Sequence, residues 1–212
     1  HRQIDNPANI QHIMGNFLKI KNGVLVRCNR ATQGHIVIPD SVTKIGEYAF
    51  DGCEGLTSIE IPNSVTEIGE DAFRCCFHLT SIEIPNSVTE IGKCAFFRCS
   101  GLTSIEIPNS VTKIGGGAFF DCRGLTSIIV DERNKHYSAE DGILYSKDKT
   151  LLHTCLPSKI GVVKVPNSVT EIGEYAFYDC TGLTSIEIPN SVTVIGKEAF
   201  YGCKGLTSIE IP

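Results

Sequence analysis

The chain repeats itself every 23 residues. The string Ser-Ile-Glu-Ile-Pro-Asn-Ser-Val-Thr begins at Ser58, Ser81, Ser104 and Ser185, and a partial copy ends the chain. An Ala-Phe pair recurs in six units, with the same step inside each group of units. A unit of this length cannot bury its apolar side chains alone, so neighbouring units must stack around one continuous core.

One unit, residues 56–79, shows what each repeat is expected to form. The alternation around Ile59 and Ile61 predicts a short strand, and the Pro-Asn-Ser sequence that follows predicts a turn. A glycine occupies the place of Gly69 in all six full units, which predicts either a positive φ or a close approach of the neighbouring coil. The next segment is expected to form one helical turn that directs Phe73 into the core.

The repeat length and pattern indicate a fold family. The period falls within the range of about 20–29 residues of leucine-rich repeats. A three-stranded β-helix is the alternative, but the Ala-Phe-x-x-Cys turn interrupts the rhythm of short strands in such a fold. The pattern L-T-S-I-x-I-P-x-S-V-T-x-I-G-x-x-A-F-x-x-C resembles the BspA-like leucine-rich repeats of bacterial surface proteins over residues 17–212.

This resemblance carries expectations for fold and function. It implies a leucine-rich-repeat right-handed solenoid, a β-rich α/β fold of stacked short parallel strands and short helical turns in one curved domain. It also implies a cell-surface or secreted location and adhesion to host proteins or to other microbes.

The period fails once. After Pro108 the next repeat proline is expected at position 131, where Asp131 stands, and the phase resumes at Pro166. The interrupting sequence is related to the segment 22–28 near the N-terminus, and both predict short hairpin strands. We divide the chain into an N-terminal lead (1–16), an N-terminal capping module (17–38), four repeats (39–130), an irregular hairpin-like interruption (131–165) and two further repeats ending at an uncapped strand (166–212).

Composition argues against several classes of partner. The net charge of −5 lacks the basic excess of a nucleic-acid-binding surface, and no run of 18 apolar residues could span a membrane. The chain starts at His1 without a recognisable signal segment, so we expect a processed piece of a longer protein. We expect a monomer.

The ten cysteines prompt a search for disulfides and metal sites. Parallel Cβ vectors in a stack aim poorly at one another, so we predict free thiols throughout. His153 and Cys155 lie two apart on one strand but lack further ligands, and no metal site is predicted. Six cysteines share one repeat position: Cys53, Cys76, Cys99, Cys122, Cys180 and Cys203.

Catalytic signatures are missing from the sequence. It contains no G-x-S-x-G or phosphate-binding glycine motif, and the many copies of Ser58 speak against a unique nucleophile. Neither an enzyme activity nor a cofactor is predicted.

Outward strand positions form the candidate ligand surface. Glutamates stacked on neighbouring strands repel one another and destabilise the sheet, and the fold does not require them. The row is either an acidic strip for a basic partner or cation, or a by-product of repeat duplication. The irregular segment is the second candidate, because it is where units differ. The candidate residues are Thr57, Ser58, Glu60, Thr80, Glu83, Thr103, Glu106, Glu187 and Glu210 on the strands, and Asp131, Glu132, Arg133, Lys135, His136 and Tyr137 in the irregular segment.

These observations predict a non-catalytic protein-binding or adhesion module. Its contact surface would be the concave strand face together with the irregular segment, and its partner a host or microbial surface protein. A structural spacer that displays other domains of a longer surface protein is the alternative, and an enzyme is the third hypothesis.

Overall fold

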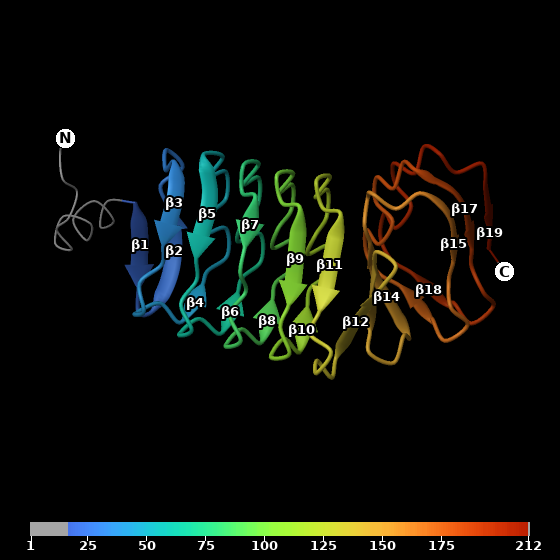
Figure 1. The fold of residues 1–212 in the computed structure, drawn as a ribbon, viewed down its shortest axis with the longest axis horizontal. Coiled ribbons are helices and arrows are strands. Elements are labelled where there is room, and N and C mark those ends of the chain that lie inside the picture. The colour runs from blue at the N-terminus through green and yellow to red at the C-terminus, as the bar shows by residue number, and fades with distance from the viewer. Residues whose placement is uncertain (1–16, 212) are drawn as a thin grey trace.

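The computed structural model describes residues 17–211, and the predicted lead (1–16) and Pro212 lie outside this range. The protein is a β-solenoid of about eight turns, which confirms the predicted fold class. Figure 1 shows the coils following one another from the N-terminal to the C-terminal end. No helix occurs among residues 17–211, so the expected short helical turns are absent.

Before the interruption, each coil contributes one strand to each of two ladders. Paired neighbours are parallel except β1 and β2, and they pair at a step of 23 residues in regular repeats, as Ser58 does with Ser81. In the second ladder, β7 and β9 lie in neighbouring coils without strand pairing, so it consists of a three-stranded and a two-stranded sheet. The first ladder is β1 (Leu18–Lys21), β2 (Val24–Cys28), β4 (Lys44–Ile45), β6 (Glu67–Ile68), β8 (Glu90–Ile91) and β10 (Lys113–Ile114). The second ladder, here called the strand face, is β3 (Gly34–Val37), β5 (Leu56–Glu60), β7 (Ser81–Ile82), β9 (Ser104–Ile107) and β11 (Ser127–Val130).

The third side of each regular coil is a turn, here called the turn side. Asp71 and Cys75 both have positive φ, of 51° and 58°, which is incompatible with the predicted helical turn. The backbone nevertheless bonds to the next coil, because the N–H of Phe73 donates to the carbonyl of Ala95 at 2.8 Å. The coil is therefore three-sided, with strands on two sides and a hydrogen-bonded turn on the third.

The predicted inward residues form the core. Val65, Ile68, Phe73, Cys76 and Leu79 are all fully buried. Phenylalanine rings of successive coils are stacked, with the Phe73 centroid 5.0 Å from the preceding ring and 5.3 Å from the following one. Identical residues stack because the strands of neighbouring coils pair residues that are one repeat length apart.

The shared glycine reflects a close approach of backbones. Gly92 has no positive φ, and a Cβ at this position would lie 2.5 Å from the backbone N of Glu70 in the preceding coil. Of the two predicted reasons for this glycine, the close approach is therefore confirmed and the positive φ is wrong.

The interruption forms an antiparallel meander that divides the core. β13 lies between the two cores, with Leu144 in the first and Ile143 and Tyr145 in the second. Adjacent strand residues point to opposite faces, which explains this division. The remaining strands are β12 (Tyr137–Glu140), β13 (Ile143–Ser146), β14 (Leu151–Cys155), β15 (Gly161–Lys164), β16 (Glu171–Ile172), β17 (Leu183–Glu187), β18 (Val194–Ile195) and β19 (Ser208–Glu210).

The solenoid changes direction at this meander. Figure 1 shows the coils before β12 edge-on and those after it more nearly face-on. Only residues 156–160 join β14 to β15, whereas residues 46–55 join β4 to β5. This shortened coil has no turn side, so the turns that flank it meet, and the Phe120 and Tyr175 rings stack at 4.4 Å.

Candidate functional site

The glutamates of the strand face form an exposed ladder. Glu60, Glu83 and Glu106 project from successive coils, and exposed Val37 and Ile129 take the same position at the two ends. Among residues 17–211, no cation lies within 4.0 Å of the carboxylates of Glu83 or Glu106. This strip of negative charge is therefore largely unneutralised within the described part of the chain.

The second half carries a shorter version of this ladder. Glu187 on β17 pairs in register with Glu210 on β19, and the Lys164 ammonium lies 3.5 Å from the Glu187 carboxylate. Because one lysine already faces it, the second half is the less acidic part of the strand surface.

One histidine joins the ladder at its N-terminal end. His35 Nδ1 lies 2.7 Å from the Ser58 hydroxyl, and His35 Nε2 lies 3.1 Å from the Glu60 carboxylate. Ser58 lies within a strand that is paired on both sides, with β3 and with β7. This contact, which the sequence did not predict, joins a histidine, a serine and a glutamate of two neighbouring coils.

The threonines beside the glutamates satisfy backbone groups. The Thr80 hydroxyl donates to the carbonyl of Thr57 in the preceding coil at 3.3 Å, and Thr126 does the same to Thr103. Thr57, Thr80 and Thr103 are all exposed. Their hydroxyls stabilise the stack and remain at the edge of the acidic strip.

The irregular segment is only partly available to a ligand. Glu132, Lys135 and His136 are exposed as expected. Asp131 accepts two hydrogen bonds from the Arg133 guanidinium, at 3.0 and 2.7 Å, and these lower the pKa of Asp131 to about 2. The exposed Arg133 is therefore already paired with an acid of its own chain.

Tyr137 was predicted to be exposed, and this prediction is wrong. Its side chain is buried, and its hydroxyl accepts a hydrogen bond from the N–H of Ile114 at 2.8 Å. The Ile114 carbonyl accepts from His153 Nε2 at 3.2 Å, and the Thr154 hydroxyl donates to His153 Nδ1. Side chains thus form the hydrogen bonds of the Ile114 backbone at the end of the first ladder, where strand pairing stops. Burial lowers the pKa of His153.

Asn134 stabilises the same junction by hydrogen bonds. Its amide donates to the carbonyls of Pro108 and Val111, at 2.8 and 3.0 Å, and its side-chain oxygen accepts from the N–H groups of His136 and Tyr137. Sequence reasoning missed this role. The available signal was spacing, because Asn134 follows Val111 by one repeat.

The two residues considered as metal ligands are not part of a larger cluster within residues 17–211. His153 and Cys155 are both buried, and no group of three metal-ligating side chains occurs in the described residues. All ten cysteines are unbridged.

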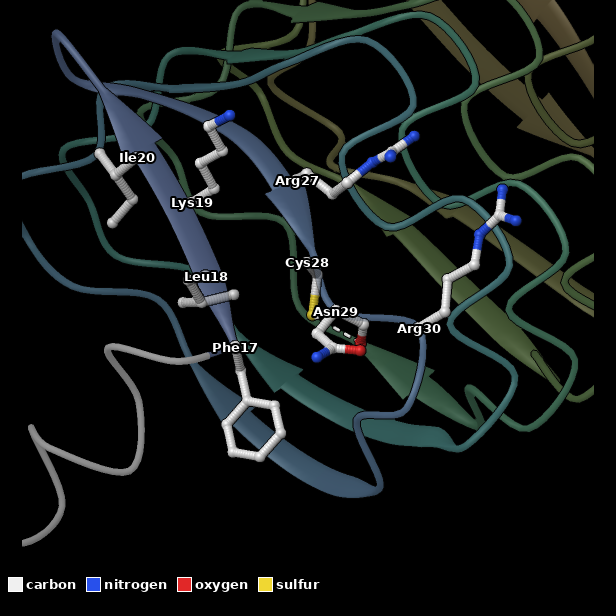
Figure 2. Close-up of a pocket in the computed structure, with 8 residues that line it drawn as sticks. All are labelled: Phe17, Leu18, Lys19, Ile20, Arg27, Cys28, Asn29 and Arg30. Carbon is white, nitrogen blue, oxygen red and sulfur yellow. Dashed lines mark hydrogen bonds between the residues drawn. The ribbon is translucent and has the colours of Figure 1, made fainter.

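A pocket that the sequence did not reveal lies at the N-terminal end. It has a volume of about 710 Å³ and is lined by β1, β2 and the loop that follows. Figure 2 shows Lys19, Arg27 and Arg30 around it, with the Cys28 sulfur beside Asn29. Arg30 is paired with Asp51, whereas no acid lies within ion-pair distance of Lys19 or Arg27 in the described residues.

In residues 17–211, no helix has the length and apolar character needed to cross a membrane.

Solved structures of bacterial leucine-rich-repeat proteins are similar to this fold. A protein from Eubacterium ventriosum has a TM-score of 0.66 and 28% identity, covering 83% of this chain and 59% of that protein. The pneumococcal vaccine antigen PcpA has a TM-score of 0.65 and 22% identity, covering 92% of this chain and 67% of that one. The Treponema pallidum leucine-rich-repeat protein has a TM-score of 0.52 and 29% identity, covering 88% and 72%. This chain thus spans about three fifths of the Eubacterium protein's length.

No curated protein matches the chain. Six copies of the BspA type leucine-rich repeat region match residues 18–140 and 155–212, which together make up most of the sequence. The chain therefore belongs to the BspA-type leucine-rich-repeat family.

Proposed function

We propose that this chain is a non-catalytic protein-binding module, at the cell surface or in secreted form, and that its contact surface is the strand face. The observation that carries the proposal is the acidic ladder of Glu60, Glu83 and Glu106, of which two carboxylates have no cation within 4.0 Å in residues 17–211. Like charges stacked across strands destabilise a sheet. A basic partner surface would remove that cost on binding.

The surroundings of the ladder define the partner further. Val37 and Ile129 are 39% and 53% exposed at its ends, so the acidic strip is bordered by apolar side chains. Interfaces combine such apolar contact with charges that orient the partner. The partner is thus a protein with a basic strip flanked by apolar residues, and exposed Glu132, Lys135 and His136 contribute at the C-terminal border.

The test is binding to a panel of purified extracellular matrix proteins immobilised on a biosensor. We expect binding to at least one protein that weakens at least tenfold between 0.05 and 0.5 M salt, because salt screens exposed charges. The triple variant Glu60→Gln, Glu83→Gln, Glu106→Gln should lose that binding and keep its fold.

The matched control makes the same charge change on the turn side. Glu47, Glu54 and Glu70 are exposed there, and their replacement by Gln should leave binding unchanged. Equal loss in both triple variants, or binding that is indifferent to salt, contradicts the use of the strand face. If no panel protein binds, the structural spacer becomes the better interpretation.

A further inference from the structure

Two pairs of thiols are arranged differently from the other cysteines of the core. In regular repeats the thiol donates to a phenylalanine carbonyl of the preceding coil, as Cys76 does to Phe50 at 3.2 Å and Cys99 to Phe73 at 3.1 Å. Cys53 has no such partner, because the preceding coil joins β2 to β3 by residues 29–33 alone and lacks a turn side.

Without that carbonyl, Cys53 approaches another sulfur. The sulfurs of Cys53 and Cys28 lie 3.9 and 3.7 Å from the same atom, the carbonyl oxygen of Asn29. The two sulfurs therefore share one hydrogen-bond acceptor. Both are buried, at the junction of the N-terminal hairpin coil with the first full repeat.

The same arrangement occurs a second time, after the interruption. Here the shortened coil joins β14 to β15, and the sulfurs of Cys155 and Cys180 each lie 3.7 Å from the carbonyl oxygen of Leu156. These two sulfurs likewise share one hydrogen-bond acceptor. Two separate segments of the chain thus bring a cysteine of a hairpin coil against a cysteine of the following repeat.

We propose that Cys28–Cys53 and Cys155–Cys180 are redox-active dithiols, each of which closes to a disulfide that staples a hairpin coil to the repeat after it. This departs from the prediction of ten free thiols. The other ladder cysteines remain thiols, because each donates to a phenylalanine carbonyl of the preceding coil that no second sulfur of the described residues shares.

The first pair has the features of a reactive dithiol. The adjacent Cys53 thiol lowers the pKa of Cys28, and a lowered pKa increases the reactive thiolate form. Cys28 also lines the N-terminal pocket, beside the cations Lys19 and Arg27. The cations of the pocket attract an anionic oxidant such as glutathione disulfide.

The reaction balances as an ordinary thiol–disulfide exchange. The Cys28 thiolate attacks one sulfur of glutathione disulfide, forms a mixed disulfide and releases one glutathione thiolate. Cys53 then attacks the Cys28 sulfur, forms the Cys28–Cys53 bond and releases the second glutathione, which takes up the Cys53 proton. Two electrons pass from the protein to the small disulfide, which leaves as two thiols.

The test uses the full chain in glutathione buffers of increasing oxidised fraction, quenched by alkylation. Intact mass and non-reducing peptide mapping should show the loss of two hydrogens per bridge, at Cys28–Cys53 first and then at Cys155–Cys180. The second pair closes at least tenfold more slowly, because Cys155 does not line the pocket. Cys53→Ser should abolish the first bridge only, and Cys76→Ser, at the same repeat position, should leave both.

Two results would overturn the proposal. One is a fully reduced chain in buffers that oxidise an unfolded reference peptide with two cysteines. The other is a Cys76–Cys99 bridge that forms before either proposed pair. Since the wild-type mapping needs no variant, the proposal stays testable even where Cys53→Ser fails to fold.

Discussion

For the replacement of Asn134 by valine, the repeat consensus and the structure predict opposite changes in stability. Valine occupies this position in the preceding repeats, as at Val88 and Val111, so a consensus argument predicts a gain in stability. The Asn134 side chain makes four hydrogen bonds to backbone groups at the junction. At about 1–1.5 kcal/mol each, their loss costs about 4–6 kcal/mol. Burial of the valine methyl groups returns at most about 2 kcal/mol, so we expect a net loss of about 2–4 kcal/mol.

The assay is urea unfolding followed by far-ultraviolet circular dichroism, since the chain contains no tryptophan. The midpoint of Asn134→Val should fall, and the two cores should unfold in separate transitions, because Asn134 couples the last regular turn to the meander. Asn109→Val, at an exposed position, should change stability by about 0.5 kcal/mol or less. An Asn134→Val variant as stable as the wild type would refute the capping role.

Three further changes test the packing of coils and junction. Gly92→Ala brings a Cβ to 2.5 Å from the preceding backbone and should cost more than about 2 kcal/mol in urea unfolding, whereas Gly55→Ala meets only a flexible glutamine side chain and should cost less. Tyr137→Phe leaves the N–H of Ile114 without its acceptor, and unfolding should show a loss of about 1–3 kcal/mol. Burial lowers the pKa of His153, so the native state binds fewer protons than the unfolded chain below about pH 6.5. Stability should then be complete above that pH and fall as the pH drops, with a smaller slope in His153→Gln; equal slopes would contradict this.

The regular coils were predictable because one repeat length fixes which residues stack. Ile68 and Ile91 are equivalent residues of neighbouring repeats, and strand pairing at the repeat length places them side by side. The same spacing stacks Phe73 and Cys76 on their equivalents in the next repeat. The turn was not predictable in the same way. Asp71 and Cys75 adopt positive φ, and their N–H groups donate hydrogen bonds to carbonyls of the next coil. The sequence of a single repeat does not indicate these contacts with its neighbour.

At the junction, the sequence did not indicate that side chains replace strand pairing. Tyr137 follows Ile114 by one repeat, yet its side chain rather than its backbone continues the ladder. Gly117 makes room for a residue far along the sequence, because a Cβ there would lie 2.8 Å from the Tyr175 ring. Such contacts between distant repeats cannot be derived from local pattern, and neither can the contact of His35 with Ser58 and Glu60.

Carboxyl footprinting of the complex with the panel protein that binds most tightly tests the proposed function most directly. We expect the partner to protect Glu60, Glu83 and Glu106 from carbodiimide-coupled labelling and to leave Glu47 and Glu70 as reactive as in the free chain. Protection of the turn-side carboxylates, with the ladder still fully labelled, would contradict binding through the strand face.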